Sequence, residues 1–237
     1  LMESFDADVC MMAYVLLLVP QVVLDAPRYG TFQFHPSLCP EHRGPSSINW
    51  PIAMGKTRTG LSIFWPNERL DEGPIMLQKS CSIEPDETLG SVYFNKLFPM
   101  GVDAMLEGLD LIKSGIIIKH DQRVGSGSYE GWFGKSASKI DWSKPIQDIY
   151  NIIRAGNPAP GAWTLFDGNE IKIYDSELVA GQGDIGEVIA VSDEGVTVQG
   201  DGGIVLIKRV RPDGEEKMLA FEWAKSKELV PGQFLGS

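Results

Sequence analysis

The order of segment types along the chain limits its fold more than any other feature. In the first half, strand-like apolar runs alternate with stretches of helical spacing, a pattern typical of α/β domains. After Gly115 the pattern changes to short strand-like runs separated by turn residues. The sequence therefore predicts an α/β part followed by a small β domain. The predicted strands of the first half are 9–14, 30–34, 61–65 and 75–79.

Three segments have the spacing of helices. Ser46 or Ser47 can cap a helix that runs toward Met54. In the second half, Pro145–Ala155 is periodic and starts with proline, which is favoured in the first turn of a helix. Between these two, apolar residues recur at intervals of three and four, which predicts a helix with one core-facing stripe. The residues of this stripe are Val102, Met105, Leu106, Leu109 and Ile112.

The stretch between the two halves, residues 119–144, is rich in glycine and serine and lacks sustained periodicity. We therefore predict a linker that crosses the surface of the first domain. Beyond it, Asp-Gly and Glu-Gly turns separate short apolar runs at 171–174, 188–191 and 204–210. A small closed barrel would pair such strands without leaving exposed edges. The predicted domains are accordingly 1–118 and 145–237, joined by the linker 119–144.

Charge and cysteine content argue against several classes of protein. The 237 residues include 32 acidic and 21 basic side chains, and a net charge of -11 argues against a broad surface for nucleic acid or anionic membranes. The longest apolar run, 9–19, is shorter than the roughly 20 residues that a membrane-spanning helix needs. Three cysteines without metal-binding spacing predict a reducing compartment, and residues 1–8 lack the basic start of a signal peptide. We therefore expect a cytoplasmic location.

Few side chains are available for proton transfer, because the chain has three histidines. His35 follows an extended segment, so its ring is expected at the carboxyl end of a strand, where α/β sheets bind ligands. Asp71 lies in a second loop just before a predicted strand, and a carboxylate beside an imidazole can perform acid–base catalysis. From these residues alone, a structural histidine is the more common alternative. His42 is interpreted as a surface loop residue and His120 as part of the linker, and neither is given a role.

Two stretches of consecutive residues contain His35 and Asp71: residues 35–44 are HPSLCPEHRG, and residues 70–78 are LDEGPIMLQ. These stretches resemble the signatures H-P-S-L-L-P-x-x-R-G and L-D-T-G-D-I-L-L-Q of the 10-formyltetrahydrofolate-dependent formyltransferases. His35 and Asp71 are 36 residues apart, the separation that the family keeps between its catalytic His and Asp. Within the family, segments 47–50 and 97–99 most resemble the hydrolase domain of 10-formyltetrahydrofolate dehydrogenase, followed by methionyl-tRNA formyltransferase.

The resemblance implies a fold for each half. Residues 1–118 would be the C-terminal part of a Rossmann-like catalytic domain, whose first βαβαβ half would precede Leu1. Residues 145–237 would form a small OB-like barrel, since 140–142 and 158–163 look like the opening of the family's C-terminal domain. We expect an N-terminally truncated domain of this kind to expose an apolar sheet edge and to aggregate.

The resemblance also implies a reaction, in which the formyl group of 10-formyltetrahydrofolate passes through a tetrahedral intermediate to an amine or to water, without a metal. His35 would donate to the developing oxyanion, and Asp71 would keep the imidazole protonated and help to take the proton of the nucleophile. Gln33 stands where the transferases usually have Asn, and the resemblance implies that its side-chain amide is a second donor to the oxyanion. The residues that would bind the folate are Leu17, Leu18, Val19, Ser37, Leu38, Cys39, Pro40 and Asp71.

The alternative to folate binding by residues 17–19 is a core strand without a binding role. The two motifs favour folate binding. A second departure from the family pattern lies in the loop of Asp71, where Glu72 and Pro74 replace Thr and Asp. This change would suit a protein of another class, a catalytically inactive folate-binding module. Retention of His35 and Asp71 favours the enzyme.

The formyl acceptor stays open at this stage. Residues 121–237 carry 12 basic and 18 acidic side chains, which is unfavourable for phosphate contacts with a tRNA. Lys208, Arg209 and Arg211 form a single basic cluster in this part. A small-molecule amine, such as that of a sugar nucleotide, or water is therefore favoured, and methionyl-tRNA is the alternative.

Overall fold

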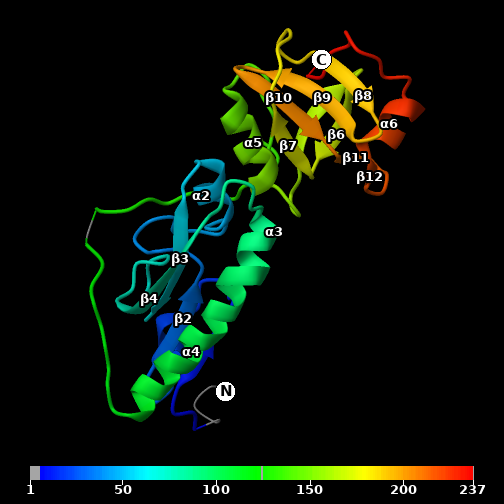
Figure 1. Cartoon of the computed structure of the whole chain (residues 1–237). Helices are drawn as coiled ribbons and strands as arrows, with labels where there is room; N and C mark the ends of the chain where they lie inside the picture. The colour runs from blue at the N-terminus through cyan, green and yellow to red at the C-terminus, as the bar shows by residue number, and fades with distance from the viewer. Residues whose placement is uncertain (1–5, 124, 237) are drawn as a thin grey trace. The chain divides into compact units, whose positions relative to one another are not determined.

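The computed structural model describes residues 6–123 and 125–236, and these form two compact units (Figure 1). The first unit contains the chain up to Pro51 together with Thr57–Ile83 and Ser91–Trp132. The second contains Ile52–Lys56, Glu84–Gly90 and the chain from Phe133 onward. In the described ranges, no helix is both long and apolar enough to cross a membrane.

The N-terminal part of the chain combines short helices with one sheet. All four predicted strands are present, and their bounds agree with the predictions to within three residues. The elements, in chain order, are β1 Cys10–Met12, α1 Gln21–Leu24, β2 Thr31–His35, α2 Asn49–Ala53, β3 Arg58–Phe64, β4 Ile75–Ser82, α3 Leu89–Val92, the π-helical turn η2 Tyr93–Leu97 and α4 Phe98–Lys113.

The sheet of the first unit has the order β1-β2-β3-β4 and is mixed. Strands β1 and β2 are parallel, whereas β3 pairs antiparallel with both β2 and β4. Because β1 and β2 are parallel, their carboxyl ends at Met12 and His35 lie at the same edge of the sheet. The loops that follow these two strands therefore start side by side.

Helix α4 runs along the sheet and contacts β3 and β4 (Figure 1). The helix is present as predicted, but its apolar residues do not form one core-facing stripe. Met105 and Ile112 are buried, whereas Val102 and Leu106 are about half exposed. The prediction of a single buried stripe is therefore wrong for two of its five residues.

Small residues on α4 explain this distribution. A Cβ atom added at Gly101 would lie 2.6 Å from the ring of Phe34, and one at Gly108 would lie 3.0 Å from the sulfur of Met76. The helix approaches the sheet so closely that its contact face has no room for large side chains at these positions. Bulky residues at neighbouring positions consequently lie beside the contact rather than within it.

The second unit consists mainly of strands with a helix on either side in the sequence. The predicted helix at 145–155 is present, with Ile149, Tyr150 and Ile153 buried, and Pro145 is its N-cap. The elements are α5 Ile146–Ala155, β5 Ala162–Phe166, β6 Asn169–Ile173, β7 Ser176–Val179, β8 Val188–Ser192, β9 Gly195–Gly200, β10 Gly203–Ile207, β11 Arg209–Pro212, β12 Met218–Leu219 and α6 Ala220–Ser226.

These strands form two four-stranded antiparallel sheets, β7-β10-β9-β8 and β12-β11-β6-β5. Within the described residues of this unit they do not make the closed barrel that the turn spacing predicted. The chain passes from one sheet to the other twice, between β6 and β7 and at Lys208 between β10 and β11. At the second crossing, which we call the Asp175 corner, the backbone amides of Lys208 and Arg209 both donate to the carbonyl oxygen of Asp175. These bonds lie where the pairing of β10 with β7 ends and the chain leaves the first of the two sheets.

The exposed apolar residues of the first unit lead to a prediction about solubility. β1 is an edge strand, and the exposed faces of α4 include Phe98, Val102 and Leu106. We expect the 237-residue chain to self-associate in a concentration-dependent way, as sedimentation velocity would measure. The double variant Val102→Lys/Leu106→Lys should self-associate less, whereas Ser114→Lys, at the C-cap of the same helix, should not. A monomer that unfolds cooperatively would contradict this expectation.

The loop that contains Asp71 leads to a second prediction, because it touches the neighbouring backbone. A Cβ atom added at Gly73 would lie 1.7 Å from the carbonyl oxygen of Trp65, whereas one at Gly131 would meet no atom within 4 Å. We expect Gly73→Ala to lower the free energy of unfolding by about 1–3 kcal/mol, and Gly131→Ala to change it by less than about 0.5 kcal/mol. Urea unfolding of both variants measures the difference, and equal effects would refute the steric argument.

Candidate functional site

The two residues singled out by their motifs lie together in the first unit. His35 is the last residue of β2, and Asp71 lies in the loop between β3 and β4. The His35 Nδ1 atom is 3.7 Å from the Asp71 Oδ2 atom, and both residues are buried, with 6% and 7% of their surface exposed. His35 and Asp71 are 36 residues apart in the sequence, and the antiparallel pairing of β2 with β3 brings them together. In this pairing Ser62 lies opposite His35.

The surrounding backbone fixes the hydrogen bonding of this pair. The His35 Nε2 atom lies 3.1 Å from the carbonyl oxygen of His42, and the amide of Gly44 donates to Asp71 Oδ2 at 2.9 Å. Since a carbonyl oxygen only accepts, the Nε2 atom must be the donor and carries a proton. The Nδ1 atom then faces the carboxylate, and both contacts are favourable together when each ring nitrogen is protonated.

The loop of Asp71 is held from a third segment. Asp71 has a φ of 54°, in the left-handed region that Asp tolerates better than most residues. The side-chain amide of Gln122 donates to the carbonyl oxygens of Asp71 and Gly73, at 2.8 and 2.9 Å. The position of the Asp71 carboxylate is thus set by residues about 50 positions later in the sequence.

His42 is not a surface residue, which corrects the interpretation of it as part of a surface loop. It is 7% exposed, and its Nδ1 atom lies 3.3 Å from Glu130 Oε2. Its charged neighbour Arg43 pairs with Glu72 at 3.0 Å. Sequence analysis missed Gln122 and Glu130 as site residues, because both lie in the predicted linker and belong to neither motif.

Gln33 lies on β2 two residues before His35, so the two side chains lie on the same face of the sheet. Its side-chain amide is 3.4 Å from the carbonyl oxygen of Val15, in the loop that follows β1. In this loop Leu17 and Leu18 are 80% and 68% exposed, which excludes the alternative of a core strand. An exposed apolar loop therefore follows the edge strand next to the His35 strand.

The other predicted folate-binding loop, Ser37–Pro40, follows β2 and is tightly bonded to the sheet. The hydroxyl of Ser62 donates to the Ser37 carbonyl and accepts from the Cys39 amide, and the Gln78 amide donates to the Cys39 carbonyl. Burial raises the pKa of the Cys39 thiol to about 11, so this cysteine is protonated at neutral pH and is no nucleophile. The peptide bond before Pro40 is cis.

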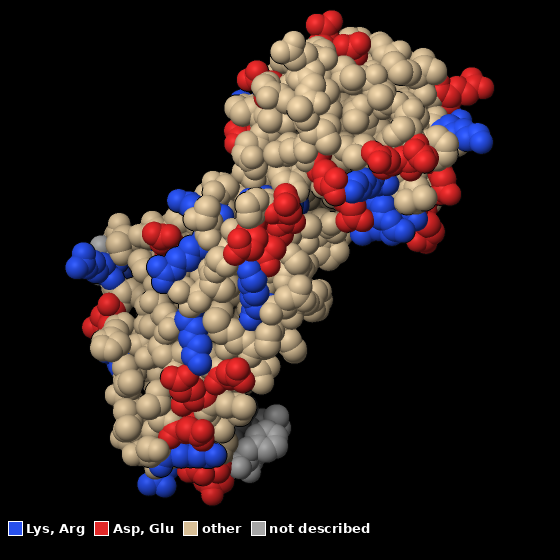
Figure 2. Space-filling model, in the orientation of Figure 1, with Lys and Arg blue, Asp and Glu red and all other residues tan. Residues whose placement is uncertain are grey.

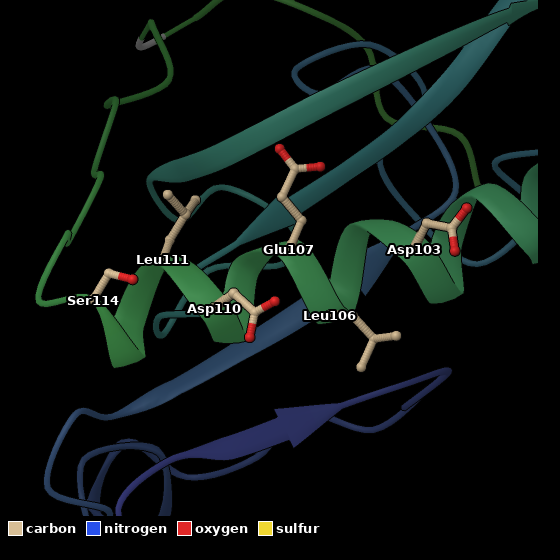
Figure 3. A pocket seen from close by; sticks show the side chains of 6 residues that line it. All are labelled: Asp103, Leu106, Glu107, Asp110, Leu111 and Ser114. Atoms are coloured by element: carbon tan, nitrogen blue, oxygen red, sulfur yellow. The ribbon is translucent and has the colours of Figure 1, made fainter.

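An open hollow on α4 contains none of the predicted site residues (Figure 3). It is lined by Asp103, Leu106, Glu107, Asp110, Leu111 and Ser114. Figure 3 shows Leu106 and Glu107 pointing to opposite sides of the helix, and Glu107 pairs with Lys79 at 2.7 Å. Across the described parts of the chain, no three His, Cys, Asp or Glu side chains are grouped as a metal site requires.

Comparison with known families agrees with the motifs. Residues 1–107 match the formyl transferase family, and residues 134–228 match the formyl transferase C-terminal domain. The first match includes both motif loops, and the second covers the strands of the second unit. Together the two matches cover most of the chain.

Individual relatives agree as well. Mitochondrial 10-formyltetrahydrofolate dehydrogenase of Mus musculus is 34% identical over 226 residues, which are 92% of this chain but 24% of that protein. Methionyl-tRNA formyltransferase of Geotalea uraniireducens is 32% identical over 234 residues, 99% of this chain and 74% of that protein. A crystal structure of HypX from Aquifex aeolicus in complex with tetrahydrofolic acid has the same fold, with a TM-score of 0.77 at 22% identity over 92% of this chain and 38% of that one.

The chain thus spans about a quarter of the dehydrogenase and about three quarters of the transferase that it matches. Its His and Asp motifs lie within the N-terminal match, and its mixed α/β architecture agrees with the fold of the solved relative. The chain belongs to the formyl transferase family.

Proposed function

We propose that this chain removes the formyl group from 10-formyltetrahydrofolate, the formyl donor of its family, with His35 and Asp71 as catalytic residues. The observation that carries the proposal is the buried contact of 3.7 Å between these two side chains at the carboxyl end of β2. A lone structural histidine would not need a buried carboxylate whose own oxygen is bonded by the Gly44 amide. An imidazole and a carboxylate held in this way can donate and accept protons during a reaction.

In the proposed reaction, the nucleophile attacks the formyl carbon on N10 of the folate and the carbonyl oxygen becomes an oxyanion. The Nε2–H group of His35, which donates to the His42 carbonyl in the free chain, would donate to this oxyanion as the stronger acceptor. Asp71 accepts the proton of the nucleophile, the oxyanion then collapses to a carbonyl, and the bond between N10 and the formyl carbon breaks as Asp71 passes that proton to N10. The products are tetrahydrofolate and either formate or an N-formylated amine.

The amide of Gln33 is the proposed second donor to the oxyanion. It lies on the same face of β2 as His35, and its present acceptor, the carbonyl of Val15, is 3.4 Å away, which is a long hydrogen bond. A weakly bound amide can change its acceptor at low cost. Gln33 is therefore suited to replace the asparagine that the transferases usually have at this position.

The folate itself is proposed to lie along the two loops that begin side by side at the sheet edge. The exposed side chains of Leu17 and Leu18 offer apolar surface for a flat heterocycle, and the backbone of residues 17–19 offers amides and carbonyls. The loop with Ser37, Leu38, Cys39 and Pro40 would form the opposite wall. Its bonds to Ser62 and Gln78 would hold this wall rigid before the folate binds.

Water or a small amine is the proposed acceptor, in preference to methionyl-tRNA. Two cations of the basic cluster are paired, Lys208 with Glu177 and Arg209 with Asp175. On the face drawn in Figure 2, Lys and Arg side chains are interspersed with Asp and Glu. Because paired cations release few counterions, this surface favours a small acceptor over a tRNA.

The finer predictions on fold and location belong to the same proposal. Residues 1–118 would correspond to part of a Rossmann-like catalytic domain, and 145–237 to an OB-like domain whose two sheets meet at the Asp175 corner. Cys10, Cys39 and Cys81 are not joined in disulfide bonds, which is compatible with the proposal of a reducing compartment such as the cytoplasm. No step of the proposed reaction requires a metal.

The catalytic proposal is tested by substitution of the pair. We expect His35→Ala and Asp71→Asn each to lower the rate of tetrahydrofolate release by about 100- to 10,000-fold, because each removes a proton donor or acceptor. The matched control is His120→Ala, since the side chain of His120 is exposed and only its backbone pairs with Ile75. Turnover that persists in His35→Ala would refute the proposal, and retained folate affinity without turnover in the unmodified chain would favour the binding module.

The acceptor is tested by adding candidates to the same assay. We expect tetrahydrofolate and formate to be released in equal amounts with water alone, or the rate to rise with a sugar-nucleotide amine. Methionyl-tRNA should leave the rate unchanged. Release that requires methionyl-tRNA would contradict the charge argument and make this chain a tRNA formyltransferase.

A further inference from the structure

A second imidazole–carboxylate pair, His42 with Glu130, lies next to the first. Glu130 ends a short segment, residues 125–130, which we call the strap. The strap bonds to the backbone around His42: Ser128 Oγ accepts from the His42 amide at 2.9 Å, and the Arg43 amide donates to the Ser128 carbonyl at 3.1 Å. The side chain of Glu130 adds a contact to the ring of His42, with Oε2 3.3 Å from Nδ1.

The backbone held by the strap is the backbone that contacts the catalytic pair. The His42 carbonyl accepts from His35, and the Gly44 amide, two residues later, donates to Asp71. These two groups point toward the pair because His42 and Gly44 have φ values of 53° and 106°. A left-handed conformation is unfavourable for a non-glycine residue, so the conformation of His42 needs contacts that hold it.

The side chain of His42 supplies such a contact. Histidine tolerates this backbone conformation better than most residues, but glycine adopts it more easily, so the conformation is compatible with His42 and still benefits from contacts that hold it. Its ring is buried, and Glu130 is the acidic group that faces it. The buried ring–carboxylate contact therefore links the strap to the orientation of the His42 carbonyl.

We propose that His42 and Glu130 are positioning residues, which hold the His42 carbonyl against His35 Nε2 and the Gly44 amide against Asp71. This inference rests on the proposed function of His35 and Asp71. The held carbonyl keeps a proton on Nε2 and directs the other nitrogen of His35 to Asp71. His42 and Glu130 thus act on the reaction through the orientation of the His35 ring and the proton on its Nε2 atom, without contact with the substrate.

If Glu130 had a purely structural role, the expected result would differ. The strap is also held by backbone bonds, including that from Ser128 to the Pro40 carbonyl at 3.0 Å and that from Glu130 to the Arg43 carbonyl at 3.1 Å. If the Glu130 carboxylate served only to anchor the strap, its removal would lower stability and leave the ring of His35 as it is. The state of the His35 ring therefore separates the two roles.

The test measures this ring directly, in the full 237-residue chain. The chain has three histidines, so long-range ¹H–¹⁵N spectra contain three sets of ring signals, which His35→Ala and His120→Ala assign. We expect Glu130→Ala to shift the His35 ring nitrogens and to lower kcat by up to about 100-fold with little change in the KM for 10-formyltetrahydrofolate. Glu130→Gln, which retains a hydrogen-bond acceptor, should restore most of both.

Two further variants keep the test decisive. Glu68→Ala is the matched control, because Glu68 is an exposed glutamate of the same unit. His42→Asn tolerates the left-handed backbone but lacks the ring, and it should reproduce the effects of Glu130→Ala even where that variant folds poorly. Unchanged His35 signals in folded Glu130→Ala or His42→Asn would overturn the positioning role, as would an equal effect of Glu68→Ala. Absence of formyl release from the unmodified chain would instead overturn the proposed function, so the two failures are distinguished.

Discussion

The burial of an imidazole beside a carboxylate is the constraint on which the first unit depends. A buried polar group without a partner costs about 1–3 kcal/mol, and more when it is charged. His35 and Asp71 therefore need complementary groups on every side that faces the protein. These come from the carbonyl of His42 and the amide of Gly44, and both require a backbone conformation that few residues adopt.

This requirement explains why loops of the first unit make close contacts with the rest of the unit although they lack helix and strand. The loop of Asp71 approaches the backbone so closely at Gly73 that no Cβ atom fits. The segment after α4 crosses the unit and donates from Gln122 to that same loop. These loops thus have little room for larger side chains, because their backbone must provide hydrogen-bond partners for His35 and Asp71.

The sequence predicted well whatever depends on short-range pattern. The four strands of the first sheet follow from short apolar runs, helix α5 follows from apolar residues at helical spacing, and His35 and Asp71 follow from motifs of consecutive residues. Predictions that depend on packing were weaker. Val102 and Leu106 have helical spacing but are exposed, because the space between α4 and the sheet admits only small residues at Gly101 and Gly108.

The same distinction explains the second unit and the missed site residues. The turns at 167–168 and 213–214 predict strands but not where a strand leaves its sheet, which is decided by bonds to the Asp175 carbonyl. His42 and Glu130 are 88 residues apart and share no motif, so only the folded chain brings them together. A motif identifies the groups that can react. Their orientation depends on residues far away in the sequence, whose side chains hold the backbone beside the motif in an unusual conformation. Residues that tune the reaction are therefore best sought where an unusual backbone conformation beside the motif is held by a side chain from elsewhere.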